Sequence, residues 1–388
     1  MKLFLPTLIT LACTLATVAQ DKVVVPVVDL GKDYPEKVLK LSALGSVRYI
    51  PLETKDESLI KSYNHIAMDS ERIVITDRAQ NQVFIFDKNG KFLNRISRCG
   101  GGPKDYQSIT LSCVDFGRNY VYIWDNTLLN RIKAYNFDGA FVKQINVASV
   151  PWPDQMYVYD DSHLIIHCDP NNLSKQKVGN IPYMLINTST GKVTPLNLKV
   201  NTPVSGRSVT YGNDGIVNAA NQVDIYPLTK NGGKVLVSDF SHPVVFQLQN
   251  GKLNPIIKRS AVGALNADSK LISAVQNVSD RYILFRSFVM RDDKSSGKVQ
   301  VAEPRIIMYD RANKSVAEVD IFNDDLNAPG VIETWNNDLP DNTAISVIPK
   351  FVLDKRHSQG KLSGAAERLY STLDDEANDV LMILTFDK

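Results

Sequence analysis

Cysteine, tryptophan and net charge are all scarce in this chain of 388 residues. It has four cysteines and three tryptophans, and its 44 basic and 42 acidic side chains leave a formal net charge of only +2. That balance gives no chain-wide basic field for nucleic acid and no acidic surplus for cationic partners. Hydrophobic residues at 44% and charged residues at 22% are ordinary globular proportions, so the composition excludes a disordered or collagen-like protein.

Long apolar runs are missing after the first residues, and no segment reaches the roughly 18 apolar residues that a membrane-spanning helix needs. We therefore expect no transmembrane span. At the amino terminus, Lys2 precedes an apolar run over residues 3–15 and small residues at 16–19, which is the layout of a secretory signal peptide. We predict cleavage after Ala19, so that the remaining chain is exported to the periplasm or the cell surface.

The cysteines leave two questions open. A lipoprotein box that ends at Cys13 is the alternative to simple cleavage, and it would make acylated Cys13 a lipid anchor. Removal of the signal leaves Cys99, Cys113 and Cys168, an odd number that allows at most one disulfide. Cys99 and Cys113 are close enough in sequence to pair across adjacent strands, whereas a buried free thiol is the simpler interpretation of each.

Short β-branched and aromatic runs that end in turn residues recur along the chain, and no long stretch keeps the helical spacing of apolar residues. The clearest unit covers residues 72–92, and its copy at 120–141 places Gly139 49 residues after Gly90. Both glycines follow Asn or Asp, the pairs that enter the positive-φ turns of tight hairpins. Weaker copies follow at 183–193, 234–253 and 305–314. A period near 50 residues in an all-β chain predicts a β-propeller.

The two ends of the chain predict how such a propeller closes. Residues 380–388 look like the third strand of a unit whose outer strand is missing, and residues 47–52 can supply that strand. Pro51 fits an outermost strand because proline cannot donate to a central ladder. Five complete units and one shared between the ends predict an all-β fold, namely a six-bladed β-propeller with four-stranded antiparallel blades whose last blade is closed by an N-terminal strand.

These features divide the chain into three segments. We expect a signal peptide at 1–19, a lead-in at 20–40 in which residues 23–28 add a strand, and the propeller at 41–388. A single short helix is predicted at 364–370, within an insertion in the last blade.

Four motifs carry a family resemblance: Tyr49-Ile50-Pro51-Leu52-Glu53-Thr54, Phe86-Asp87-Lys88-Asn89-Gly90-Lys91-Phe92, Gly101-Gly102-Pro103-Lys104-Asp105-Tyr106 and Glu376-Ala377-Asn378-Asp379-Val380-Leu381. With them the chain, over residues 35–388, resembles the six-bladed β-propeller proteins that Bacteroidota export, which have an NHL- or TolB-like architecture. The family's glycine segment reads Gly-x-Gly-Pro-Gly-Glu-Tyr, and here Lys104-Asp105 replaces Gly-Glu. The resemblance implies a fold and an exported location, but no reaction.

The glycine segment at 98–106 supplies the first candidate ligand-binding residues. Its backbone N–H groups have the pattern of an anion-binding nest, although no P-loop ending and no helix follow it. The alternative is a blade-to-blade crossover, and such crossovers line the mouth of a propeller where ligands bind. The candidates of this segment are Arg98, Gly101, Gly102, Asp105 and Tyr106.

Aromatic residues in two other loop-like stretches are further candidates for ligand contact. Trp152 and Tyr157 lie in the first stretch, and Trp335 lies in the second. Aromatic rings beside Asp and Asn suit the stacking and hydrogen bonding of sugars or peptides, while packing between blades uses the same residues.

No metal site and no cofactor is expected. His163 and His167 resemble a metal pair, but they lie four residues apart on a strand pattern, which separates them by about 13 Å. Asp77, Asp125 and Asp239 recur after equivalent strands, and repetition favours a turn-fixing hydrogen bond over catalysis for such residues.

The missing motifs favour a non-catalytic binding or scaffolding propeller that holds a glycan, a peptide or an envelope protein at its central mouth. The alternative is a hydrolase or lyase for a polysaccharide or ester, with residues gathered from several blades. A structural subunit of an envelope complex is a third hypothesis, and it predicts an exposed apolar patch on the blade side.

Overall fold

The computed structural model describes residues 25–125, 131–147, 150–170, 181–198, 200, 204–211, 217–223, 225–266, 268–293, 298–332 and 336–388. The predicted signal peptide, the alternative lipid anchor Cys13 and the candidate Trp335 lie outside the described residues.

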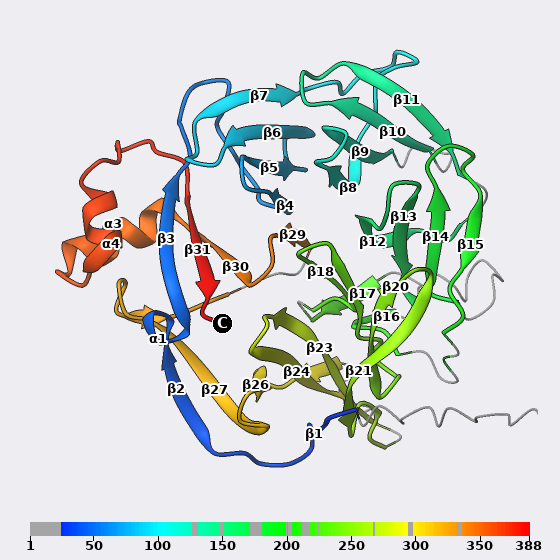
Figure 1. Ribbon diagram of the computed structural model, residues 1–388, viewed down its shortest axis with the longest axis vertical. Helices are drawn as coiled ribbons and strands as arrows, with labels where there is room; N and C mark the ends of the chain where they lie inside the picture. Colours follow the sequence, from blue (N-terminus) through cyan, green and yellow to red (C-terminus); the bar gives the residue numbers. More distant parts are fainter. Residues whose placement is uncertain are drawn as a thin grey trace, which may run out of the picture.

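Antiparallel strand groups surround a common centre (Figure 1). The first group consists of β4 (His65–Met68), β5 (Arg72–Asp77), β6 (Gln82–Asp87) and β7 (Phe92–Ile96). Its β4 lies near the centre and β7 at the rim. The Asp87 carboxylate accepts hydrogen bonds from the N–H groups of Asn89 and Lys91, and Gly90 adopts a φ of 87° between β6 and β7. The predicted turn at Gly90 is therefore confirmed.

The second and third groups repeat this order. The second has β8 (Ile109–Asp115), β9 (Tyr120–Asp125), β10 (Arg131–Asn136) and β11 (Phe141–Asn146). The third has β12 (Pro153–Val158), β13 (His163–Cys168), β14 (Tyr183–Asn187) and β15 (Val193–Pro195). Gly139 and Gly191 hold the matching turns with φ of 81° and 71°.

The next two groups carry longer strands and additions. A hairpin of β16 (Arg207–Tyr211) and β17 (Val217–Gln222) precedes the fourth group, which has β18 (Leu228–Asn231), β19 (Lys234–Val237), β20 (Val244–Gln249) and β21 (Lys252–Ser260). The fifth has β22 (Gly263–Ala264), β23 (Ser269–Val278), β24 (Tyr282–Asp293), β25 (Lys298–Val301), β26 (Arg305–Asp310), β27 (Ser315–Asn323) and β28 (Ala328–Pro329).

The lead-in supplies two strands to these groups. β1 (Val27–Asp29) pairs in parallel with β21, and β2 (Glu36–Lys40) pairs in parallel with β27. The strand expected at 23–28 thus begins only at Val27 in the described part of the chain, and β2 is an addition that the sequence did not indicate.

The two ends of the chain meet in one sheet. β31 (Val380–Phe386) lies between β30 (Thr343–Ile348) and β3 (Gly45–Pro51), and both pairings are antiparallel. The register runs from Gly45 opposite Phe386 to Pro51 opposite Val380. The predicted closure of the carboxyl-terminal strand by an amino-terminal outer strand is confirmed, with Pro51 at the end of the outermost strand.

The strand nearest the centre departs from the repeat. β29 (Asn337–Leu339) precedes β30 but pairs in parallel with β4 on one side and with β18 on the other. It therefore joins the first and fourth groups into a ten-stranded sheet across the centre (Figure 1). We call β29 the axial strand.

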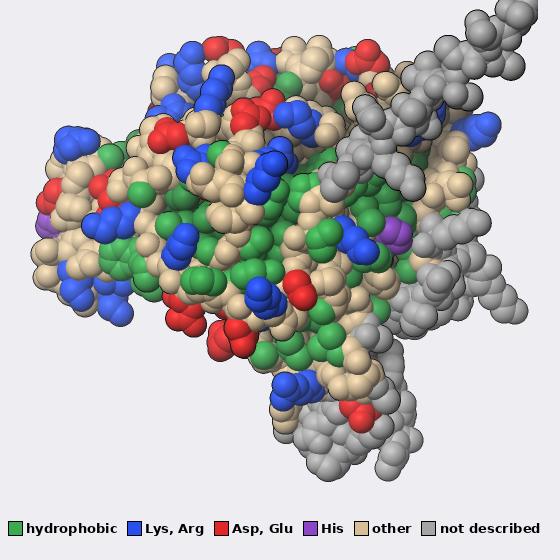
Figure 2. All heavy atoms as spheres, turned by 60° about the horizontal axis from the view of Figure 1, so that its bottom comes forward, with side chains coloured by type: hydrophobic (Ala, Val, Ile, Leu, Met, Phe, Trp, Pro, Cys, Tyr) green, Lys and Arg blue, Asp and Glu red, His purple; other side chains and the backbone are tan. Residues whose placement is uncertain are grey.

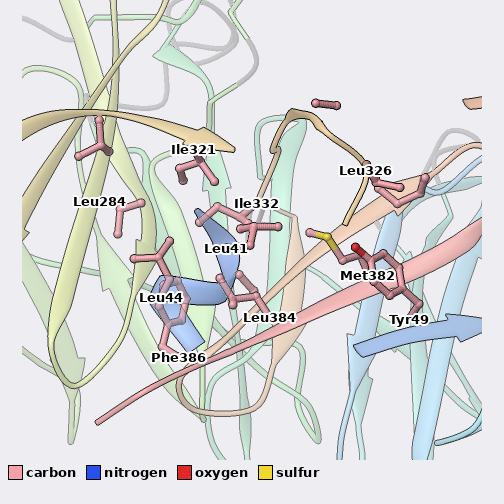
Figure 3. Close-up of a cluster of buried hydrophobic side chains, with 14 of the residues drawn as sticks. Leu41, Leu44, Tyr49, Leu284, Ile321, Leu326, Ile332, Met382, Leu384 and Phe386 are labelled. Carbon is pink, nitrogen blue, oxygen red and sulfur yellow. The ribbon is translucent and has the colours of Figure 1, made fainter. Parts of the chain in front are cut away.

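Each pair of neighbouring groups shares one buried apolar cluster, and the clusters lead from group to group and back to the first. Figure 3 shows the cluster in which Leu284 and Ile321 of the fifth group meet Met382, Leu384 and Phe386 of β31. Burial of apolar faces between neighbouring sheets is what stabilises a repeat architecture, because a single unit cannot bury its own faces.

Two of the described helices lie outside β3, and a third joins β2 to β3 (Figure 1). α4 (Gly364–Tyr370) confirms the predicted helix and lies between β30 and β31, inside the predicted insertion. The prediction of a single helix is wrong, since α1 (Leu41–Leu44) and α3 (Lys350–Ser358) also form. α3 buries only Leu353, so it shows no apolar stripe that its sequence pattern could reveal.

Candidate binding site

The turns that join the inner strands of the groups lie on one face, which we call the hairpin face. Its turns follow β4, β8, β12, β18 and β23 and precede β30. Three hollows on this face share walls around the hairpin of β18 and β19. The central and lateral hollows share Gly232 and Gly233, and the lateral hollow shares Lys234 with a third, which we call the fifth-group hollow.

The β18–β19 turn is held close to the axial strand. Gly232 and Gly233 adopt φ of 56° and 74°, the two positive values that a tight type I′ hairpin turn requires. The N–H of Gly232 donates to the carbonyl of Leu339 at 2.7 Å. Gly233 faces open space, because a Cβ added there meets no atom within 4 Å. The Lys234 ammonium pairs with Asp341 at 3.0 Å on the other side of the turn.

The central hollow, of about 380 Å³, has a buried ion pair among its lining residues. The Lys230 Nζ lies 2.6 Å from Asp338 Oδ2 of the axial strand, and each side chain is only 10% exposed. Burial raises the pKa of the Asp338 carboxyl, and the Lys230 charge and hydrogen bond oppose that rise. The walls are mostly apolar and come from several groups: Met68, Val114, Phe116, Val158, Leu339 and Pro340.

A second polar group lies close to the pair, fully inside the protein. Burial lowers the pKa of His65 to about 3, and the Lys230 charge adds to this effect. Neither ring nitrogen of His65 has a hydrogen-bond partner among the described residues. The Tyr157 ring lies beside it with 6.4 Å between the ring centroids. His65 is therefore neutral near pH 7, so the positive charge of Lys230 is balanced by the Asp338 carboxylate alone within this pair.

The other two hollows lie on either side of the β18–β19 hairpin. The fifth-group hollow, of about 490 Å³, lies toward the fifth group and includes Asp280, Arg311, Lys314 and Asp341. The lateral hollow, of about 560 Å³, lies toward the third group. There the Tyr159 hydroxyl accepts a hydrogen bond of 2.7 Å from the N–H of Gly251.

A family model described as a domain of unknown function, DUF4934, matches residues 25–385. The chain belongs to the DUF4934 family. No curated protein matches the sequence.

Solved structures of two Bacteroides proteins are similar to this DUF4934 chain. A Bacteroides fragilis NCTC 9343 protein, whose name proposes that it is exported, is similar with a TM-score of 0.65 at 14% identity, over 93% of this chain and 100% of that one. At this identity the likeness shows the fold alone. A DUF4221 family member from Bacteroides vulgatus is similar with a TM-score of 0.46 at 11% identity, over 89% of this chain and 97% of that one.

The predicted glycine segment of this DUF4934 chain forms a compact crossover. Tyr106 is fully buried, and its hydroxyl donates to the carbonyl of Asn81 at 2.7 Å. Asp105 Oδ2 accepts from the N–H of Gly102 at 3.0 Å, and the Lys133 ammonium donates to the Asp105 carbonyl. These hydrogen bonds stabilise the segment as a connection between the first and second strand groups, which is the alternative that the sequence offered to a ligand-binding nest.

Arg98 lines a hollow at the rim. Its Nε donates to the Gly139 carbonyl at 3.3 Å, in a cavity of about 410 Å³ between β7 and the turn before β11. A Cβ added at Gly101 meets open space, whereas one at Gly102 lies 2.6 Å from the Asp105 carboxylate. The structure therefore brings Gly102, Asp105 and Tyr106 together but directs Arg98 toward the outer rim.

The two aromatic candidates among the described residues differ in burial, and Tyr157 lies on β12 instead of in the expected loop. Trp152 is 58% exposed, and Tyr157 is fully buried next to His65. Burial raises the pKa of Tyr157 far above its usual value, and the negative charge of Asp338 raises it further. The Tyr157 hydroxyl therefore stays neutral. As ligand contacts, these residues remain predictions.

The residues proposed to be structural have local roles. Asp77 and Asp239 accept backbone N–H bonds in the turns that follow β5 and β19, as predicted. His163 and His167 both lie on β13, as the strand pattern predicted, and each pairs with its own aspartate. The described residues contain no group of three or more His, Cys, Asp or Glu side chains able to share a metal ion. Their cysteines Cys99, Cys113 and Cys168 are free thiols.

The sequence reasoning missed the residues of the hairpin face. The dipeptide Gly232-Gly233 between two β-rich runs was a visible signal of a tight hairpin. Its place at the centre depends on the axial strand, whose partners β4 and β18 are distant in sequence.

The outer wall of the protein is partly apolar. Figure 2, which turns the lower edge of Figure 1 forward, shows hydrophobic side chains gathered in the middle of that side with single charged side chains around them. Val38 of the edge strand β2 is 69% exposed. No helix in the described part of the chain has the length and apolarity needed to cross a membrane.

Proposed function

We propose that this DUF4934 protein is an exported, non-catalytic six-bladed β-propeller that holds a glycan, a peptide or a segment of a partner protein on its hairpin face. The shared walls of the three hollows around the β18–β19 hairpin carry this proposal. A ligand that extends over several units of a chain fits connected hollows of this kind better than a single small molecule does.

The blade count rests on the strand groups and on their shared clusters. The five groups and the three-stranded sheet of β30, β31 and β3 support six units. The prediction of four-stranded blades is wrong for the last one, because the axial strand pairs with β4 and β18 instead of β30. Six apolar clusters between successive units agree with this count.

Export is supported by the signal-peptide pattern at residues 1–19 and by the name of the similar Bacteroides fragilis protein. Periplasm and cell surface are both compatible with that pattern, and a lipid anchor at Cys13 is the alternative to cleavage after Ala19.

The test is a thermal-shift screen of the purified protein against peptides and against neutral and acidic oligosaccharides. A ligand that binds only the folded state raises Tm by mass action. Gly233→Asn should abolish the shift, since it adds a side chain where the central and lateral hollows join and asparagine tolerates positive φ. Gly360→Asn is the matched control, because Gly360 also has positive φ and open space but lies on the loop between α3 and α4.

Equal loss of the shift in both variants, or no loss in Gly233→Asn, would contradict binding at the hairpin face. Turnover of a bound polysaccharide or ester would identify the alternative, a hydrolase or lyase, and would contradict the non-catalytic part of the proposal.

A further inference from the structure

We propose that the fifth-group hollow binds an acidic side chain of a peptide ligand, with Arg311 and Lys314 as the residues that hold its carboxylate. The inference rests on the proposed binding function and adds the chemical class of the ligand. It follows from which charged side chains in the hollow already have bonding partners and from the nature of its floor.

The two acids that line the hollow already have partners. Asp341 pairs with Lys234 at 3.0 Å. Asp280 Oδ2 accepts 2.8 Å from the Asn342 amide, and the Asp280 N–H donates back to the same amide at 2.6 Å. These contacts fix both carboxylates within the protein's own surface.

The two remaining cations have no such partner. Among the described residues, neither Arg311 nor Lys314 forms a salt bridge or a side-chain hydrogen bond. Both follow β26 and line the same hollow. Burial lowers the pKa of Arg311, and the Asp280 charge opposes this from beyond hydrogen-bond distance. Both side chains are exposed to solvent, and an anion bound here would pair with a guanidinium whose planar donors suit a carboxylate.

The floor of the hollow favours a peptide over a sugar. Its accessible aliphatic part comes from Ile256 and Val278, which are half-buried, while Leu236 and Ile283 line it from below and are almost fully buried. Among the described residues, the only aromatic ring that lines it belongs to Tyr309, which is 8% exposed, so the ring offers little face for a sugar to stack on. An aliphatic side chain next to an acidic one would cover this floor and reach the cations together.

One polar side chain in the hollow is placed to form hydrogen bonds with the backbone of such a peptide. Gln247 on β20 lines both the fifth-group and the lateral hollow, and its amide forms no hydrogen bond to another described residue. A side-chain amide offers one acceptor and two donor hydrogens, which suits a peptide group. A ligand could thus run from the fifth-group hollow past Lys234 into the lateral hollow.

The test uses fluorescence anisotropy with two matched sets of short labelled peptides. One set contains leucine and glutamate, and the other contains leucine and glutamine at the same positions. We expect only the glutamate set to bind, with affinity that falls as salt increases. Arg311→Gln and Lys314→Asn should each weaken binding about tenfold, the effect of losing one charge-assisted hydrogen bond. Asparagine suits position 314, where φ is 51°.

Lys91→Gln is the matched control for lost charge, since Lys91 is exposed on the turn before β7 and lines none of the three hollows; its binding should be unchanged. Equal binding of the two peptide sets, or full affinity in Arg311→Gln, would overturn the inference while leaving ligand binding intact. Tight binding of oligogalacturonate without binding of acidic peptides would overturn the peptide class. Failure of every peptide and sugar to bind would instead contradict the proposed function itself.

Discussion

Replacing Lys230 with methionine should leave the carboxylate of Asp338, on the axial strand, buried without its ionic partner. The variant keeps most of the side-chain volume but leaves a carboxylate that is 10% exposed without its partner at 2.6 Å. Removing one partner of a buried ion pair costs about 3–5 kcal/mol. With an unfolding entropy of about 2.1 cal/mol/K per residue and about 360 folded residues, each kcal/mol lowers Tm by about 1.3 °C. We therefore expect Tm to fall by about 4–7 °C.

The double variant Lys230→Met/Asp338→Leu supplies the control. It removes both buried charges, so most of the lost stability should return, because the cost lies in the isolated charge. The pH dependence has a definite sign. Burial already raises the pKa of Asp338, and loss of Lys230 raises it further. The single variant should therefore regain stability relative to the wild type as pH falls through that pKa, where the folded state takes up the proton.

Scanning calorimetry over a range of pH, with circular dichroism to follow the folded fraction, measures these effects. A loss below about 1 kcal/mol in Lys230→Met would show that the pair behaves like an exposed salt bridge. A double variant as unstable as the sum of the two single variants would show that the charges are not coupled. Either result would refute the reasoning about the floor of the central hollow.

Three further predictions concern other parts of the fold. Gly90→Ala should lower the free energy of unfolding in urea by far more than Gly139→Ala. Both glycines have positive φ, but only a Cβ at Gly90 lies 2.0 Å from a backbone oxygen of β3. Equal losses in the two variants would contradict this packing. Cys99 should be the only thiol in the described residues that reacts with Ellman's reagent before unfolding, since the other two are buried. Burial lowers the pKa of His167, but the charge and hydrogen bond of Asp154 outweigh it and raise the pKa overall. The stability from this pair is present below about pH 6.5 and lost as pH rises through the folded pKa, so Asp154→Asn should cost more at about pH 5 than at about pH 9 in thermal melts.

Local patterns in the sequence were sufficient to predict the repeating units and the closure. Asn-Gly and Asp-Gly turns have a local cause in the positive φ of Gly90 and Gly139. Residues 380–388 lacked an outer strand and residues 47–52 lacked a partner, so their pairing followed from the repeat. Closure thus needed no knowledge of distant contacts beyond the pattern itself.

The axial strand and the hollows were beyond sequence reasoning for a physical reason. Nothing in residues 337–339 indicates that they leave β30 for β4 and β18, because that choice depends on space at the centre of the fold. The hollows are formed by turns far apart in sequence. For Tyr106 the sequence left two roles open. An aromatic ring beside glycines can contact a ligand or can pack inside the crossover, and the structure buries this ring.

Binding at the hairpin face is most directly tested by hydrogen–deuterium exchange with and without the first ligand that raises Tm. The account predicts slower exchange at residues 231–234 and at 311–314, and loss of that protection in Gly233→Asn. Slower exchange only in the crossover at 98–106, with no change around the β18–β19 hairpin, would contradict binding at the hairpin face. It would indicate that the ligand binds at the glycine segment.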